Sequence, residues 1–186
     1  MTDKYTPFAA EGLILDIDLS GIDETAANLD GLPADLEMNL TITMNKSLSL
    51  LQAEVSARTP VDRDKLRGGI NYQFISPFPE LVGSVGSGAA EYAPAIEHGR
   101  KPGRMPPVDA IKFWVIRKLQ IPEEKAEGVA WAIAKSIAKR GFSPEGDVGP
   151  KGAKMFEEGL KASEQYIIQL FDSAVGRATA KANDST

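Results

Sequence analysis

Apolar and polar residues alternate near the amino end of the chain, in the segment GLILDIDL at 12–19. The odd positions of this segment, from 13 to 19, are all Leu or Ile, which is the period of a half-buried strand. Ser20 followed by Asp23 forms a weak capping box. The segment therefore predicts a strand, and after it a short helix that ends near Leu29.

A helical repeat begins at Pro33, a residue that suits the first turn of a helix. From there to about Arg58, apolar residues recur every three or four positions, which is the spacing of one helix face. These positions are Leu36, Leu40, Met44, Leu48, Leu51 and Val55. The pattern predicts one long amphipathic helix.

A turn and two extended segments follow this helix. Thr59 and Asp62 can cap a brief helical turn, and Gly68-Gly69 then leads into extended structure. Residues 70–74 alternate apolar and polar side chains, and residues 81–85 do so again after the turn PFPE. We expect a β-hairpin or two adjacent antiparallel strands.

The carboxyl half of the chain alternates between loops and helical patterns. The segment HGRKPGRMPP at 98–107 contains two glycines and three prolines, so it predicts a loop. Helices are predicted over about 107–119, 122–140 and 153–177, with a loop at 143–152. Their apolar stripes are Ile111, Trp114, Val115 and Leu119, then Val129, Ile133 and Ile137, and then Phe156, Leu160, Ile167, Phe171 and Ala174.

These elements define an α+β fold, in which a long amphipathic helix packs on a small antiparallel sheet and C-terminal helices follow. The chain of 186 residues, 42% hydrophobic and 25% charged, suits one domain with a real core. We expect residues 1–19 to be an acidic, strand-like extension, 20–177 a single α+β domain and 178–186 a flexible tail.

Composition narrows the classes of function. The chain has no cysteine, which excludes disulfides, thiolate nucleophiles and zinc ribbons. The amino end lacks the basic start and apolar run of a secretory signal. The longest purely apolar run, VAWAIA at 129–134, is far shorter than the roughly 18 residues that span a bilayer. We expect a soluble protein that is made in a cytoplasm and has no membrane partner.

Charge is unevenly distributed along the chain. Residues 1–38 hold nine carboxylates and one lysine, a net charge of −8. Residues 98–140 hold ten Lys or Arg and four carboxylates, a net charge of +6. This asymmetry indicates complementary surfaces on neighbouring subunits, and solvated charge on helix faces is the alternative reading.

The sequence offers no catalytic constellation. His98 is the single histidine, and its neighbour Glu97 points another way on a helix or strand, so a structural or interface role is favoured. The segment that begins at Asp16 imitates a calcium loop, but Ala27 stands where a bidentate glutamate is needed. VGSVGSG at 82–88 lacks the lysine of a phosphate loop. We predict no enzyme, no catalytic residue, no metal and no cofactor.

The basic stretch leaves a second possibility open. Its cations are Arg100, Lys101 and Arg104 in the loop and Lys112, Arg117 and Lys118 beyond it. They could touch phosphates, but the net charge of −5 and the lack of aromatic residues among the loop cations disfavour a dedicated DNA reader. An arginine loop that meets a neighbour's carboxylates is preferred. The alternative is a small DNA-associated regulatory protein that uses residues 98–118.

The apolar helical patterns also contain three large aromatic residues. Phe113, Trp114 and Trp131 are predicted to be core or helix-packing residues rather than a ligand cage. None of these observations assigns a chemistry to the chain.

The order of the motifs resembles that of the phage neck and tail-completion family, also called head-tail joining or minor tail proteins. The pieces are ARTPVDRDKLRGGI at 57–70, the extended segment ending in V-G at 82–86, YAPAIEHG at 92–99, and RKPGRMPP followed by WVIRKL within 100–119. The likeness continues through IAKSIAKRG and MFEEGLK, and it spans about 20–175. One departure is that Arg63-Asp64 replaces the family's usual Thr-Gly, which predicts a different turn geometry.

The resemblance implies a structural virion protein that forms a homo-oligomeric ring, with a hexamer favoured. Such a ring would join or complete head and tail, as a neck protein or tail terminator, and would be assembled in the host bacterial cytoplasm. Its partners would be other neck, connector or tail-tube proteins, and genome DNA that passes through the channel without sequence reading. The ring's copy number and its place on the head side or the tail side stay open.

The resemblance also assigns roles to residues. Leu66, Arg67 and Ile70 would set the first helix against the sheet, and Tyr92, Glu97 and Gly99 would shape a loop presented to neighbours. The subunit-interface candidates are Arg67, Tyr92, Glu97, His98, Arg100, Lys101 and Arg104.

Overall fold

The computed structural model describes residues 11–17, 34–61, 64–76, 81–88, 92–144 and 151–184. The chain divides into two compact units. The first, which we call the sheet unit, comprises Met1–Ala93 and Met155–Thr186, and the second, the helical unit, comprises Pro94–Lys154. Where the sequence pattern led us to expect one domain over 20–177, the middle of the chain forms a unit with its own small core.

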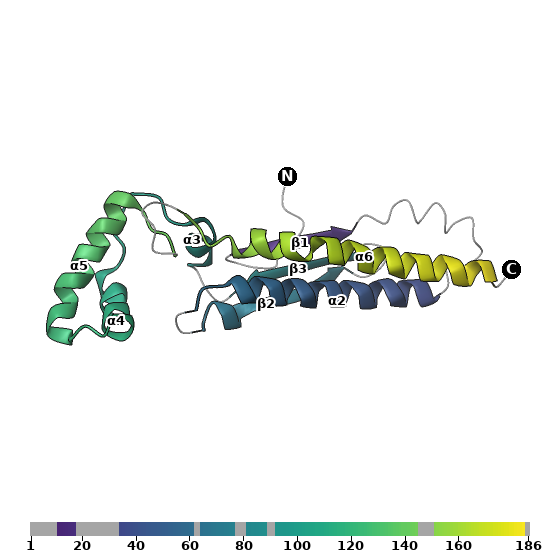
Figure 1. Ribbon diagram of the computed structural model, residues 1–186, viewed down its shortest axis with the longest axis horizontal. Helices are drawn as coiled ribbons and strands as arrows, with labels where there is room; N and C mark the ends of the chain where they lie inside the picture. Colours follow the sequence, from purple (N-terminus) through teal and green to yellow (C-terminus); the bar gives the residue numbers. More distant parts are fainter. Residues whose placement is uncertain are drawn as a thin grey trace. The chain divides into compact units, whose positions relative to one another are not determined.

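The sheet unit contains a three-stranded antiparallel sheet in the order β1-β3-β2. Its strands are β1 (Glu11–Ile17), β2 (Ile70–Ser76) and β3 (Leu81–Ser87) (Figure 1). The predicted pairing of the two central segments is confirmed. The strand predicted near the amino end is also present, and it pairs with β3, so this segment is part of the sheet. The short helix predicted over about 20–29 lies outside the described residues.

The long predicted helix is α2 (Ala34–Arg58), and it lies against β2 and β3. All six apolar positions of the predicted stripe are buried, because this face meets the rest of the sheet unit. Strand β3 is buried along its whole length, as expected for the central strand of a covered sheet. The fold is therefore α+β, with the long helix packed on a small antiparallel sheet as predicted.

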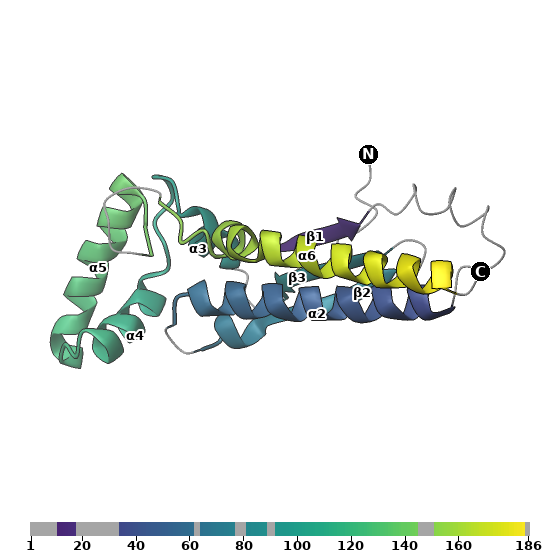
Figure 2. The same cartoon turned by 45° about the vertical axis from the view of Figure 1, so that its right-hand side comes forward.

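The last helix, α6 (Met155–Asp184), runs beside α2 (Figures 1 and 2). Phe156, Ile167, Phe171 and Ala174 of its predicted stripe are buried, and Leu160 is half-buried. Hydrogen bonds from Lys161 to Glu157 and Glu158 raise the pKa of this lysine. The helix extends seven residues beyond Arg177, where the sequence predicted its end.

The start of α6 is tied to the end of α2. The hydroxyl of Thr59 donates a hydrogen bond to the carbonyl oxygen of Val55 at 2.8 Å and lies 3.3 Å from the sulfur of Met155. Thr59 thus bonds back to α2, whereas we expected it to cap the following turn. Its other proposed capping partner, Asp62, lies outside the described residues.

The helical unit is built on α4 (Val108–Lys118) and α5 (Glu123–Arg140), which pack against each other. Their buried residues are Val115, Ala126, Ala130 and Ala134. The predicted α5 stripe of Val129, Ile133 and Ile137 is only half-buried, because the face turned to the core is the alanine face. Both helices lie within the predicted ranges.

The expectation that the large aromatic residues of these helices belong to the core is wrong. Phe113, Trp114 and Trp131 have exposed fractions of 63%, 37% and 49%. A core made chiefly of alanines has too little volume to cover indole and phenyl rings, so these rings face outward. Among the helices of the described residues, none is long and apolar enough to cross a bilayer.

Candidate subunit interface

The basic loop between α3 (Ala93–His98) and α4 is held in one shape by backbone hydrogen bonds. Arg100 and Phe142 exchange two such bonds, with N···O distances of 3.0 and 2.8 Å, and the amide of Gly103 donates to the carbonyl oxygen of Ala138 at 2.9 Å. The guanidinium of Arg100 donates to the carbonyl oxygen of Arg104 within the loop. These bonds anchor the loop to the carboxyl end of α5.

Glycines permit this loop path. Gly99 has φ 73° and Gly103 has φ 156°, values at which a side chain would be strained. Lys101 and Arg104 are exposed, and Arg100, which braces the loop, is half-buried. The motif RKPGRMPP predicted a loop. In the structure this loop is held by backbone hydrogen bonds and presents two cations to solvent.

Two further interface candidates lie at the end of α3. His98 is exposed, but Glu97 is 4% exposed. The carbonyl oxygens of Ile96 and Glu97 accept hydrogen bonds from the amides of Ala153 and Lys154, at 2.8 and 3.1 Å. Glu97 is therefore buried and does not present its side chain on the surface of the chain.

Gly152 explains why this contact is so close. A Cβ atom built on Gly152 would lie 1.7 Å from the carbonyl oxygen of Glu97 and 2.6 Å from the Cα of His98. The segment 151–154 thus packs directly on the backbone of α3. Sequence reasoning did not find this contact, because the two segments are more than fifty positions apart.

The remaining candidates, Arg67 and Tyr92, belong to the sheet unit. Arg67 is exposed at the start of the short helix η1 (Arg67–Gly69), and Tyr92 is exposed just before α3. Leu66 and Ile70, which flank η1, are buried, and the side-chain amide of Gln52 donates to the carbonyl oxygen of Ile70 at 2.8 Å. The resemblance gave Leu66, Arg67 and Ile70 the role of setting α2 against the sheet. The burial of Leu66 and Ile70 is compatible with this role, whereas Arg67 is exposed.

The structure adds an exposed surface that the sequence analysis did not single out. Ala110, Phe113, Trp114, Arg117 and Lys118 are all exposed. Their positions follow the i, i+3, i+4, i+7, i+8 spacing of one helix face, and the buried Val115 lies on the other side. We call these five residues the α4 outer face. This spacing can be read in the sequence. It was missed because the apolar stripe of Ile111, Val115 and Leu119 lies on the same helix and Trp114 was assigned to that stripe.

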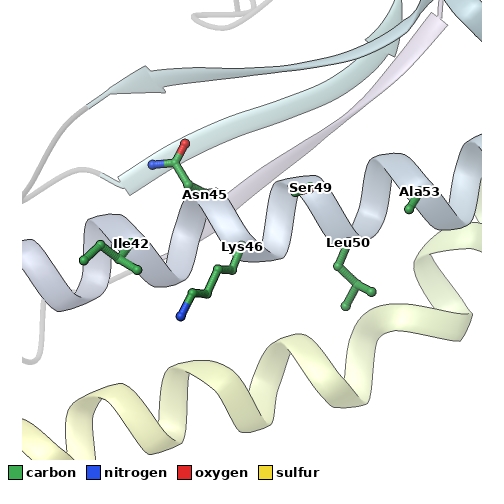
Figure 3. Close-up of a pocket in the computed structure, with 6 residues that line it drawn as sticks. All are labelled: Ile42, Asn45, Lys46, Ser49, Leu50 and Ala53. Atoms are coloured by element: carbon green, nitrogen blue, oxygen red, sulfur yellow. The ribbon is translucent and has the colours of Figure 1, made fainter.

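Two other kinds of site bear on function, a metal centre and a pocket. In the described part of the chain, no group of three or more His, Asp or Glu residues is placed to hold a metal ion. A shallow depression on α2 is lined by Ile42, Asn45, Lys46, Ser49, Leu50 and Ala53 (Figure 3). All six belong to one helix, so the depression is a helix surface on which no polar groups from other elements converge. The calcium-like segment lies mostly outside the described residues.

Comparison with known proteins identifies no relative. No protein-family model, no curated protein and no solved structure matches the chain. The interface candidates therefore rest on the sequence motifs and on the geometry of each unit.

Proposed function

We propose that the chain is a structural, non-enzymatic component of a phage virion, which forms a ring in the neck or at the head-proximal end of the tail. The ring would join or complete head and tail around the DNA channel. The observation that carries this proposal is the order of the motifs. These motifs lie on successive parts of the fold, which are the end of α2 with η1, the central strand β3, helix α3, and the basic loop with α4.

The turn at Asp64 bears on the motif assignment, because we expected the departure Arg63-Asp64 to change its geometry. This residue stands where the family has glycine, and its φ is 57°, in the left-handed region that glycine adopts most readily. The carbonyl oxygen of Asp64 accepts a hydrogen bond from the amide of Gly68 at 2.7 Å. The substitution that sets the chain apart from the motif is therefore compatible, at this residue, with a glycine-type turn.

The basic loop between α3 and α4 has two properties that suit a contact between subunits, a fixed shape and exposed cations. A closed ring with head-to-tail contacts needs two different surfaces that complement each other. Lys101 and Arg104 are exposed on a loop fixed by backbone hydrogen bonds, and residues 1–38 carry a net charge of −8. A fixed loop loses little conformational entropy on binding, which favours its use at an interface.

Deletion of the gene from the parent phage tests the proposal. A joining protein would leave filled heads beside separate, complete tails, whereas a tail-completion protein would leave tails of abnormal length. Both results support the proposal and also separate its two forms. Normal infectious particles without the chain would overturn it.

A DNA-associated regulator is the second candidate, favoured by the exposure of Lys101, Arg104, Arg117 and Lys118. A protein that neutralised four phosphates would lose duplex affinity with a slope of about −3.6 in a plot of log K against log salt concentration. A ring subunit would bind duplex DNA weakly at all salt concentrations. A salt titration of duplex binding therefore discriminates the two candidates.

A further inference from the structure

The α4 outer face exposes two aromatic rings and two cations next to one another, a combination that is unusual for a surface in contact with water alone. Phe113 is 63% exposed, and Trp114 lies next to it on the same helix face. Arg117 follows Phe113 by four residues, and Lys118 follows Trp114 by four residues, so each ring has a cation one turn away. Aromatic residues and arginine are enriched at protein interfaces, whereas free surfaces seldom gather them.

The inner side of α4 already packs against the core of the helical unit. Val115 is fully buried, and Val108 and Ile111 are half-buried on the same side. The facing helix α5 contributes Ala126, Ala130 and Ala134 to this small core. The rings of the outer face could not turn inward, because the alanine core has no volume for them. The core between α4 and α5 therefore leaves them uncovered, and any cover must come from another part of a protein.

The side chains of the α4 outer face indicate what kind of surface binds there. A surface of two aromatic rings and two cations fits an acidic surface. The leading part of this chain is acidic, since residues 1–38 hold nine carboxylates and one lysine. Within this part, β1 and the start of α2 stay in the sheet unit of their own copy, where Leu36 is buried. The basic loop next to α4 in the sequence adds the exposed Lys101 and Arg104.

We infer that the α4 outer face is an interface between copies of this chain, and that it receives the acidic leading part, residues 1–38, of a second copy. The inference rests on the proposed function in that both require self-association, and it names the surface that carries the association. Phe113 and Trp114 form the apolar centre of the contact, and Arg117 and Lys118 supply its charge complementarity. Buried aromatic anchors carry most of the binding free energy in such contacts, while charges set orientation and association rate.

Native mass spectrometry and sedimentation velocity on the full-length chain test the surface. The variant Phe113→Ser/Trp114→Ser is compared with Tyr166→Ser/Ile168→Ser, a matched control in which two exposed apolar residues of α6 are changed. We expect the α4 variant to raise the dissociation constant of the oligomer more than about tenfold, as loss of interface aromatic anchors does. The control variant is expected to assemble like the unmodified chain.

The possible outcomes separate this inference from the proposed function. An unmodified chain that assembles, together with an α4 variant that assembles equally well, overturns the α4 interface and leaves the ring proposal intact. An unmodified chain that stays monomeric at all concentrations overturns both. Equal weakening by the α4 and α6 variants also overturns the inference, because the effect would not be specific to α4.

A second measurement needs no variant and identifies the occupant. Equal amounts of unlabelled and ¹⁵N-labelled chain are mixed and treated with a carbodiimide, which joins lysines to carboxylates in direct contact. We expect Lys118 to be joined to a carboxylate within residues 1–38, in peptide pairs that contain one labelled and one unlabelled partner. Contact between copies gives mixed pairs alongside pairs of uniform label, so Lys118 products without any mixed pairs would mean contact within one chain. No Lys118 product at all would mean no contact, and either result overturns the assignment.

Discussion

The backbone of Gly83 in β3 lies directly against the side chain of Leu48 in α2. A Cβ atom built on Gly83 would lie 2.5 Å from Cδ1 and 2.8 Å from Cδ2 of Leu48. Leu48 is fully buried, so its side chain has little room to withdraw. The absence of a side chain at Gly83 thus sets how closely the long helix approaches the sheet.

Gly83→Ala is expected to lower the free energy of unfolding by about 1–3 kcal/mol, because it overpacks this contact. Chemical denaturation measures the change. In a Leu48→Ala background the same substitution should be better tolerated, since the colliding atoms are gone, and the double-mutant cycle should show coupling between the two sites. Gly176→Ala on α6 is the control, because a Cβ there meets nothing within 4 Å. Additive effects of the two core substitutions would contradict the contact.

Gly152→Ala should be more damaging, because the added Cβ would collide with the backbone oxygen of Glu97 rather than with a side chain. We expect a loss of about 3 kcal/mol or more in the stability of the helical unit, at the upper end for single substitutions. Hydrogen exchange at the amides of Ala153 and Lys154 reports the contact directly, since both amides donate to α3. Gly128→Ala on α5, where a Cβ has open space, is the control. Unchanged protection of both amides would refute this account of Gly152.

Asp64→Gly is expected to raise the free energy of unfolding by up to about 1 kcal/mol, because glycine adopts a positive φ without strain. Asp64→Val should lower it, since a β-branched residue tolerates this region poorly. Thermal and chemical denaturation of the three proteins would give this order of stability. A valine variant as stable as the glycine variant would show that the φ of 57° does not control the turn.

The buried residues of the long helix could be predicted one by one from the sequence, whereas those of the helical unit could not. The reason is physical. In α2 the buried face carries large apolar side chains, such as Leu40 and Met44, so hydropathy and burial coincide. In α5 the buried face carries Ala126, Ala130 and Ala134, which have weak hydropathy, while the larger Val129 and Ile133 lie at its margin. A pattern of large apolar residues therefore locates the helix but misplaces its core.

The candidate interface was predictable where it depends on local chemistry. A segment with two glycines and three prolines must form a loop, and its cations are solvated, as Lys101 and Arg104 are. The backbone contacts of Glu97 are made instead with residues 152–154, which no local pattern connects to α3. The pairing of β1 with β3 is likewise a contact between distant segments, and alternation alone does not choose a partner strand.

Lys101→Glu/Arg104→Glu is expected to weaken assembly while changing the stability of the monomer by no more than about 0.5 kcal/mol, because exposed charges contribute little to folding. Arg100 is left unchanged, since its guanidinium braces the loop. The control Lys46→Glu/Arg177→Glu alters the net charge equally at two exposed positions of the sheet unit. Native mass spectrometry measures assembly. Equal oligomer mass for all three proteins would count against the loop as a contact.

The central claim is that the chain is a ring component at the joint of head and tail. Electron microscopy of purified virions, with a label specific to this chain, tests it most directly. The account predicts label at the neck or at the head-proximal end of the tail, in the same place on every particle. Label on neither neck nor tail would contradict it.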